Sequence, residues 1–295
     1  MKERIVPTVD GGHLALFTYG LFDAPGDRRV LVVGGAFITA LIYRPFARSL
    51  SKCLGDEWAV DVYDRRGRGR SSGQPGDYCM ETEISDLALM LRITGARNLF
   101  GHSLGGSVVL NAVQAFQGDD RDDRRFADPS LVPDRLAVYD PAINIDGSID
   151  AQWLEGFVEA ADAGKWRLAL ARLQRGTRHS PTLSKVPEPI LALLLAGTAF
   201  TRSGRMFRQL IPTGVGELRA ALQEEDTAAH FSRLPSNTRF MAGAKSPAYF
   251  RETAQRLHRT VAGSGYEESP KGIHASVPAA VGELVSDVAE YFQAE

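Results

Sequence analysis

Short apolar runs alternate with amphipathic segments through the first half of the chain. Runs rich in apolar and β-branched residues predict strands at Arg28–Val33, Glu57–Tyr63, Asn98–Phe100 and Arg135–Tyr139. Apolar residues at helical spacing predict helices at Thr39–Leu54, Glu81–Thr94 and Leu104–Phe116. Buried strands that alternate with helices are typical of a mostly parallel sheet covered on both faces. The first 20 residues instead alternate apolar and polar positions around Asp10-Gly11-Gly12, which predicts an antiparallel hairpin at the sheet edge.

The alternation of strands and helices stops between residues 147 and 233. This segment has no clear strand pattern, and its helical stretches are Gln152–Ala163, Lys165–Arg175, Pro189–Ala199 and Gly216–Glu224. Strand patterns return at Arg239–Gly243 and Gly265–Glu268, and a final amphipathic helix is predicted at Val277–Phe292. We therefore expect an α/β core domain with a mostly parallel sheet of eight strands, formed by residues 1–146 and 234–295. An all-helical cap, residues 147–233, is inserted after the sixth strand.

Composition and charge narrow the classes of partner. The chain has 295 residues, is 44% hydrophobic and carries a net charge of −2, which gives no electrostatic basis for binding nucleic acid or an anionic membrane. No apolar run reaches the roughly 18 residues that a membrane-spanning helix needs. The first residues, MKERIVPTVDGG, lack the pattern of a secretory signal. We therefore expect a cytoplasmic protein with a small-molecule substrate, in which Cys53 and Cys79 are free thiols.

The segment Gly101-His102-Ser103-Leu104-Gly105 is the main candidate for chemistry. G-x-S-x-G is a short motif, but here it follows a predicted strand and opens a predicted helix, which is the context of a nucleophile elbow. The glycines allow the strand and the helix to approach closely, and the helix N-terminus favours negative charge that develops beside the serine. We predict that Ser103 is a nucleophile rather than a helix-capping residue.

A serine hydroxyl needs a base, and His274 is the best placed of the six histidines. It lies in a loop between the last predicted strand and the last predicted helix, at the same sheet edge as Ser103. A histidine there can act first as a general base and then as a general acid. His102 adjoins the serine in sequence, but the tight turn is expected to point its ring away. The remaining histidines lie in other parts of the predicted fold.

A carboxylate should orient the imidazole of this base. The loop after the strand that follows the cap, Met241–Pro247, contains no Asp or Glu. Asp140 ends the strand before the cap, leaves the sheet at the same rim as Ser103, and fits the chain order Ser, Asp, His. The alternatives are a serine–histidine dyad without a defined acid and a turn-capping role for Asp140 ahead of Pro141.

Two backbone N–H groups would stabilise an oxyanion at this site. We predict those of Leu104, directly after the nucleophile, and Ala36, in the loop Gly34-Gly35-Ala36-Phe37, with Phe37 N–H as the second choice for the loop donor. Phe37 and Tyr43 are predicted to line the substrate pocket, although either could belong to the core. The cap offers further apolar side chains at Trp153, Phe157, Trp166, Leu191, Leu194, Phe200 and Phe207.

Taken in order, these elements resemble the α/β-hydrolase superfamily, particularly its small esterase-like and peroxidase-like members with a helical cap. The resemblance runs over nearly the whole chain through VLVVGGAF, DVYDRRGRGRSSG, GHSLGG, VYDPA, AGAKSP and GIHASVP. GHSLGG and GIH are the most specific of these. The family commonly has histidine at the position of Gly34, so the oxyanion loop departs from the family pattern. Haloalkane dehalogenases are similar in the place of the acid, Asp140, but they and epoxide hydrolases use an aspartate nucleophile, which Ser103 argues against.

The predicted site favours a serine hydrolase that cleaves a carboxylic ester, thioester or lactone of a medium-sized apolar substrate through an acyl-enzyme. The alternative is a lyase that eliminates a carboxylate, such as acetate, from an acylated natural-product intermediate. That alternative rests on the missing acid in Met241–Pro247 and on the altered loop at Gly34. A small-molecule receptor is a third class, which an intact Ser103–His274 pair disfavours. No Cys/His/Asp cluster has ligand spacing, so neither a metal nor an organic cofactor is expected.

Overall fold

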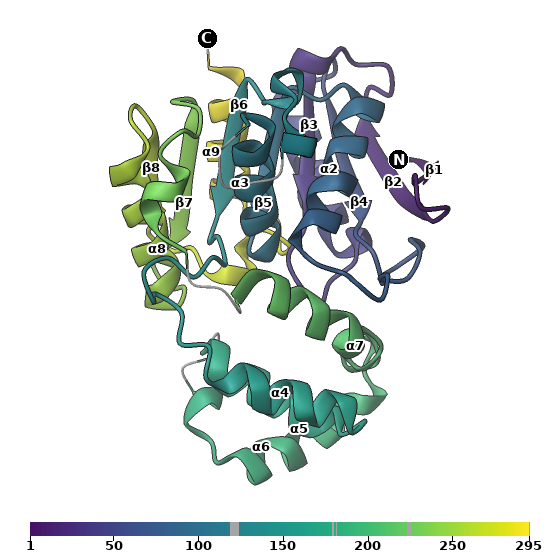
Figure 1. Cartoon of the computed structure of the whole chain (residues 1–295), viewed down its shortest axis with the longest axis vertical. Helices are drawn as coiled ribbons and strands as arrows, with labels where there is room; N and C mark the ends of the chain where they lie inside the picture. Colours follow the sequence, from purple (N-terminus) through teal and green to yellow (C-terminus); the bar gives the residue numbers. More distant parts are fainter. Residues whose placement is uncertain (119–123, 179, 181, 223–225, 295) are drawn as a thin grey trace.

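The computed structural model describes residues 1–118, 124–178, 180, 182–222 and 226–294. Within them, eight strands form one sheet in the order β1-β2-β4-β3-β5-β6-β7-β8 (Figure 1). Their bounds are β1 Lys2–Pro7, β2 His13–Gly20, β3 Arg29–Val33, β4 Ala59–Asp64, β5 Asn98–His102, β6 Arg135–Tyr139, β7 Thr238–Gly243 and β8 Gly265–Ser269. The pairs β1–β2 and β2–β4 are antiparallel and all other pairs are parallel. The predicted fold class and the edge hairpin are confirmed.

Helices cover both faces of this sheet, as its buried central strands require. The core helices are α1 Arg44–Leu54, α2 Met80–Thr94, α3 Leu104–Phe116, α8 Ala248–Thr260 and α9 Gly282–Gln293. Because side chains alternate along a strand, Val30 and Val32 of β3 pack with α1 and α9, whereas Leu31 and Val33 pack with α2, α3 and α8. Each such fully buried side chain contributes about 1.5–3 kcal/mol of transfer free energy, so both faces stabilise the sheet.

The segment between β6 and β7 is helical in its described part, as predicted. It contains α4 Trp153–Asp162, α5 Trp166–Thr177, α6 Glu188–Leu195 and α7 Arg202–Leu222. In Figure 1, α7 lies between the strand ends and the outer helices α4 to α6, and it contacts both α3 and α4. None of the described helices is long and apolar enough to cross a lipid bilayer.

The predicted helix at Gly216–Glu224 starts too late, because α7 begins at Arg202. The predicted end of this helix, Glu224, lies outside the described residues. His179, one of the six histidines, lies outside them as well. Proline disfavours a helix interior, but Pro212 lies inside α7. Its neighbours instead seat the helix on the core: Thr213 Oγ1 donates a hydrogen bond to Gly67 O at 2.8 Å, and a Cβ at Gly214 would meet the Phe37 ring. Contact with the core therefore outweighs the poor helix propensity of this stretch.

Short 3₁₀ turns connect several elements. They are Gly26–Arg28, Ala40–Tyr43, Arg124–Phe126, Pro129–Leu131, Leu183–Lys185, Ala196–Phe200, Ala228–Phe231 and His274–Ser276. Cys53 and Cys79 are both exposed and free, as predicted.

The N-terminus of α3 passes unusually close to β3 and β5. A Cβ at Gly105 would lie 2.1 Å from Val33 O and 2.7 Å from Gly34 O, and a Cβ at Gly101 would lie 2.5 Å from a methyl group of Val109. Backbone carbonyls cannot move aside as a flexible side chain can. Only glycine at these two positions therefore permits the strand and the helix to meet.

This crowding predicts a large loss of stability in Gly105→Ala. We expect the free energy of unfolding to fall by about 3 kcal/mol or more, since the added methyl group forces the backbone of α3 away from β3. Urea unfolding followed by circular dichroism measures the change. Gly73→Ala is the matched control, because a Cβ there meets no atom within 4 Å. Equal stability of the two variants would contradict the close approach.

Candidate active site

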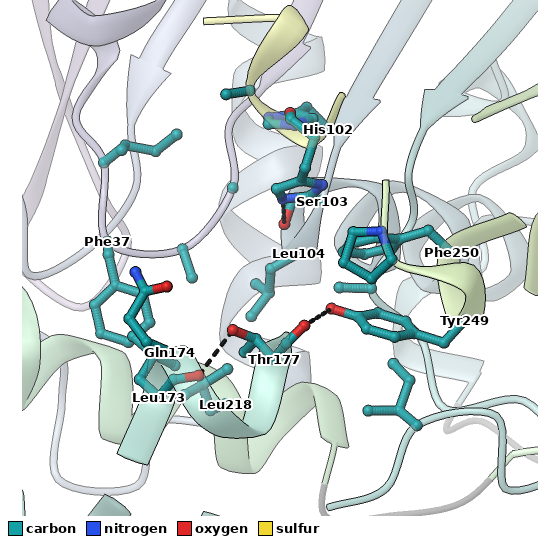
Figure 2. A pocket seen from close by; sticks show the side chains of 18 of the residues that line it. Phe37, His102, Ser103, Leu104, Leu173, Gln174, Thr177, Leu218, Tyr249 and Phe250 are labelled. Atoms are coloured by element: carbon teal, nitrogen blue, oxygen red, sulfur yellow. Dashed lines mark hydrogen bonds between the residues drawn. The ribbon is translucent and has the colours of Figure 1, made fainter. Parts of the chain in front are cut away.

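Ser103 occupies the turn between β5 and α3, with φ 56° and ψ −126°. A residue other than glycine held in such a region costs about 1–3 kcal/mol, so the surroundings must impose it. They do so through the backbone: Ser103 N donates to Tyr139 O at 3.0 Å, and Ser103 O accepts from Gly106 N at 2.8 Å and Ala142 N at 3.0 Å. Figure 2 shows the Ser103 side chain pointing into a cavity while the His102 ring lies on the other side of the turn.

His274 reaches this serine from the 3₁₀ turn after β8. Its Nε2 lies 3.0 Å from Ser103 Oγ, and its Nδ1 lies 3.1 Å from Asp140 Oδ2. The imidazole also stacks on the ring of Phe250 in α8, with centroids 4.4 Å apart and planes 7° from parallel. The carboxylate and the aromatic ring together restrict the rotation of the imidazole.

Asp140 follows the last residue of β6, has φ 48°, and is fully buried. Its Oδ1 accepts a hydrogen bond from Gly243 N at 3.0 Å, and its Oδ2 accepts one from Ser246 Oγ at 2.5 Å. The loop after β7 therefore supplies donors to the acid rather than the acid itself. Sequence reasoning searched this loop for a carboxylate and passed over Ser246, although its hydroxyl is the kind of donor that a buried carboxylate needs.

Burial dominates the electrostatics of the base. Removal from water lowers the pKa of His274 below its ordinary value, because a buried imidazolium loses its hydration. The carboxylate of Asp140 acts in the opposite direction, since it attracts a positive charge on the ring. The net direction leaves the imidazole neutral near pH 7, and a neutral Nε2 can accept the proton of the Ser103 hydroxyl.

The loop 34–37 lies directly against the nucleophile. A Cβ at Gly35 would lie 2.9 Å from Ser103 Cβ, and the loop turns through Phe37, which has φ 58°. Leu104 is the first residue of α3, where backbone N–H groups have no acceptor within the helix. Ala36, Phe37 and Leu104, whose N–H groups are the predicted oxyanion donors, all line the cavity beside Ser103.

Two buried arginines that sequence reasoning did not single out hold this loop. Arg65 donates from Nε to Gly34 O at 3.1 Å and from Nη2 to Gly35 O at 3.2 Å. Arg68 donates from Nη1 to Gly35 O at 2.7 Å and to Ile38 O at 2.9 Å. These carbonyls accept charge-assisted hydrogen bonds, which are stronger than those between neutral groups.

The same arginines form ion pairs with two buried glutamates. Arg65 pairs with Glu83 of α2 at 2.5 Å and with Glu217 of α7 at 2.9 Å, and Arg68 pairs with Glu217 as well. All four side chains are only 1–2% exposed. Because α7 belongs to the helical segment between β6 and β7, this network links that segment to the loop beside Ser103.

The cavity that Ser103 faces has a volume of about 510 Å³ and a largely apolar lining. Phe37 lines it as predicted, and so do Trp153 and Phe207 of the helical segment. The other five apolar residues suggested there are absent from the described lining: Phe157 and Leu191 are buried, Trp166 packs partly buried against the core cluster, and Leu194 and Phe200 are exposed. Figure 2 shows Gln174 and Thr177 of α5 on the wall opposite Ser103.

The prediction that Tyr43 lines the pocket is wrong. Tyr43 is 1% exposed, packs in the core cluster between the sheet and α1, and is absent from the described lining. Its hydroxyl contacts Gly35 N and His102 Nδ1 instead, each at 2.7 Å. Alternation of apolar residues in the sequence could not show on which side of the loop this phenol lies.

Comparisons of the sequence and of the structure with known proteins both point to the alpha/beta hydrolase fold. A sequence profile described as "alpha/beta hydrolase fold" matches residues 28–160. An alpha/beta hydrolase structure from Sphaerobacter thermophilus is 25% identical, with a TM-score of 0.74, over 98% of this chain and 100% of that chain. An esterase from Exiguobacterium antarcticum is 17% identical, with a TM-score of 0.71, over 99% of this chain and 100% of the other.

An enol-lactonase from Burkholderia xenovorans is also similar in structure. It is 20% identical, with a TM-score of 0.68, over 98% of this chain and 99% of that chain. No curated protein sequence gives a significant match to this chain. At these low identities the esterase and the lactonase show a shared fold, and the substrate has to be argued from the site itself.

The state of His274 predicts how Ser103 reactivity depends on pH. Reaction with a fluorophosphonate should slow as the pH falls through the His274 pKa, because an imidazolium cannot accept the serine proton. Burial lowers this pKa, so the midpoint should lie below the ordinary histidine value of 6.5. Labelling rates between about pH 4 and pH 9, with circular dichroism to verify folding at each pH, measure it. A midpoint above 6.5 would mean that Asp140 outweighs burial.

The buried ion pairs predict a specific loss of stability in Glu217→Gln. This change leaves the charges of Arg65 and Arg68 with one carboxylate fewer, and breaking a buried pair costs about 3 kcal/mol or more. Glu57→Gln is the control, because Glu57 pairs with Arg28 at the surface and should change stability by less than about 1 kcal/mol. Urea unfolding of the three proteins tests this, and equal losses would count against the network.

Proposed function

Because the chain belongs to the α/β-hydrolase superfamily, we propose that it is a serine hydrolase that cleaves a carboxylic ester, thioester or lactone. One observation carries the proposal: Ser103, His274 and Asp140 form a continuous hydrogen-bonded series, with contacts of 3.0 and 3.1 Å, that opens on an apolar cavity. Nucleophile, base and orienting acid in that order are what acyl transfer to serine requires.

In the proposed reaction, Ser103 Oγ attacks the carbonyl carbon of the substrate while His274 Nε2 accepts its proton. The N–H groups of Leu104 and Ala36 stabilise the oxyanion of the tetrahedral intermediate. His274 then protonates the leaving oxygen or sulfur as the bond to the acyl carbon breaks. Water, deprotonated by the same nitrogen, attacks the acyl carbon. The bond from that carbon to Ser103 Oγ then breaks, His274 returns the proton to Ser103 Oγ, and the acid leaves. Asp140 holds the ring so that Nε2 faces the serine throughout.

The cavity supports a medium-sized apolar substrate. Its volume of about 510 Å³ is in the range of small-molecule sites, and most of its lining is aliphatic or aromatic. Residues 147–233 would act as the cap over this cavity, since α5 and α7 contribute to its wall. The structural neighbours include one protein named as an esterase and another named as an enol-lactonase, which fits the proposed range of carbonyl substrates.

The elimination reaction considered from the sequence has less support. One of its two grounds was the absence of a carboxylate after the strand that follows the helical segment. Asp140 contacts His274 from the end of β6, so an acid is present and that ground is removed. The other ground, Gly34 in the oxyanion loop, bears on loop geometry rather than on the type of reaction. Hydrolysis is therefore the function that the site favours.

The proposal predicts a single covalent adduct at Ser103. Intact-protein mass spectrometry after treatment with a fluorophosphonate should show one adduct on the wild type, since only an activated serine displaces fluoride from phosphorus at an appreciable rate. Ser103→Ala should abolish the adduct, and His274→Ala should slow its formation by about 10⁴-fold or more. Screening of esters, thioesters and lactones on the same proteins would then identify the acyl group.

Ser107→Ala provides the matched control for this experiment. Ser107 is a buried serine on the same helix, one turn after the nucleophile, and the proposal gives it no part in the reaction. This variant should keep the adduct. A folded wild type that forms no adduct would overturn the serine hydrolase proposal and would reopen elimination or ligand binding as the function.

A further inference from the structure

A buried chain of hydrogen bonds runs behind Ser103, through Tyr43, which is absent from the described lining of the cavity, and through His102, which contributes to that lining. Gly35 N donates to Tyr43 Oη at 2.7 Å, Tyr43 Oη lies 2.7 Å from His102 Nδ1, and His102 Nε2 lies 2.9 Å from His274 O. These three contacts connect the oxyanion loop, the nucleophile elbow and the turn that carries the base. The reaction described above uses neither Tyr43 nor the His102 ring.

The two ends of this chain determine the direction of every hydrogen bond in it. The Gly35 amide can only donate and the His274 carbonyl can only accept. Tyr43 accepts from the amide, so its own O–H is available to donate to Nδ1 of His102. Because Nδ1 then accepts, the proton of the neutral imidazole is on Nε2, where it donates to His274 O. Donors and acceptors match at each step without any group left over.

Burial keeps the chain in this state. Tyr43 is 1% exposed and His102 is 2% exposed. Burial raises the pKa of the Tyr43 phenol, so its hydroxyl keeps its proton near pH 7 and can donate it. The His102 ring lies between those of Tyr43 and His274, with centroids 5.8 and 4.8 Å away. Water therefore has little access to replace a missing partner.

The phenol also takes the space of a side chain in the oxyanion loop. A Cβ at Gly34 would lie 2.5 Å from Cε2 of Tyr43, so no other residue fits at 34 while the ring is present. The hydroxyl then binds the next amide, that of Gly35, which immediately precedes the predicted oxyanion donor Ala36. The ring and the hydroxyl thus determine where this part of the loop runs.

We propose that Tyr43 and His102 are positioning residues, which hold the oxyanion loop and the backbone of His274 in register on opposite sides of Ser103. The inference rests on the proposed serine hydrolase function. Tyr43 is absent from the described lining of the cavity, and both ring nitrogens of His102, which is 2% exposed, contact protein groups rather than the cavity. Tyr43 sets the Gly35 peptide and hence the direction of Ala36 N–H, while His102 sets the His274 carbonyl and hence the point from which the imidazole reaches Ser103.

Tyr43→Phe tests the first half of the chain, since it removes only the hydroxyl and keeps the ring. The probe is a fluorophosphonate, whose phosphoryl oxygen requires the oxyanion donors during attack. We expect the inactivation rate constant at saturating probe to fall roughly 10- to 100-fold, because a displaced donor acts mainly in the transition state. The concentration for half-maximal inactivation should change by less than about threefold. A merely structural role would lower the melting temperature without this separation.

Tyr19→Phe is the matched control. Tyr19 is a tyrosine of β2 that is equally buried, at 2% exposure, and its hydroxyl has no hydrogen-bond partner among the described residues. Removal of this hydroxyl should leave the inactivation rate at the wild-type value. A loss as large as that in Tyr43→Phe would show that any buried tyrosine hydroxyl matters, and would overturn the proposal.

His102→Gln tests the second half, and the double variant tests whether the two residues act together. A glutamine amide can still donate to His274 O but does not reproduce the acceptor geometry of Nδ1. If one chain connects both residues, the inactivation rate constant of the double variant should be no more than about threefold below that of the slower single variant. Multiplied losses would mean that Tyr43 and His102 act independently, which contradicts the proposed register.

The outcomes separate this proposal from the function on which it rests. If the wild-type protein is not labelled, or if labelling survives in Ser103→Ala, the proposed serine hydrolase function is overturned. The positioning role is then overturned as well. Labelling that depends on Ser103 but proceeds at the wild-type rate in folded Tyr43→Phe would leave the hydrolase function intact and overturn the positioning role alone.

Discussion

The turn at Ser103 imposes the constraint on which the rest of the site depends. A serine can present its hydroxyl above the sheet only if β5 reverses into α3 within one residue, and this reversal brings α3 against the carbonyls of Val33 and Gly34. The strained φ of 56° is maintained because hydrogen bonds from β6 and the following loop hold the Ser103 backbone on both sides. The loop 34–37 and Asp140 lie next to Ser103 because they follow β3 and β6, the strands on either side of β5.

The buried charged groups around this turn have ion-pair or hydrogen-bond partners. Asp140 has two donors besides the imidazole, and the guanidinium groups of Arg65 and Arg68 face both the loop carbonyls and the carboxylates of Glu83 and Glu217. Such pairs contribute little net stability, because desolvation offsets their attraction. What they provide is geometry: the carbonyls of Gly34 and Gly35, beside Ser103, have arginine donors whose positions are determined by other buried charges. Among Arg65, Arg68, Glu83 and Glu217, only Glu217 belongs to the helical segment between β6 and β7.

The sequence was sufficient for the parts of the site that depend on local chain patterns. Strand, glycine turn and helix around Ser103 are consecutive residues, and the loop of His274 follows the last strand, so topology alone predicts that the two meet. Asp140 was found for the same reason, since parallel strands end at one rim. Its donors and the arginine network were not found, because they join residues from α2, α7 and the loop after β7, and no local pattern records such pairs. The direction of Tyr43 depends on its packing against Gly34, which periodicity cannot show.

The start of α7, which was predicted too late, also shows that local sequence patterns do not record long-range contacts. Pro212 and Gly214 lower the helix propensity of the stretch, so the local pattern predicts a helix only after them, from Gly216. In the folded chain Gly214 is where the ring of Phe37 packs, and Thr213 binds Gly67 in the loop that carries Arg65 and Arg68. The residues that disfavour a helix locally are thus the ones that let α7 approach the loop beside Ser103. The lining of the cavity and the position of the loop 34–37 therefore share one structural element, because α7 both lines the cavity and holds Glu217 against the two arginines.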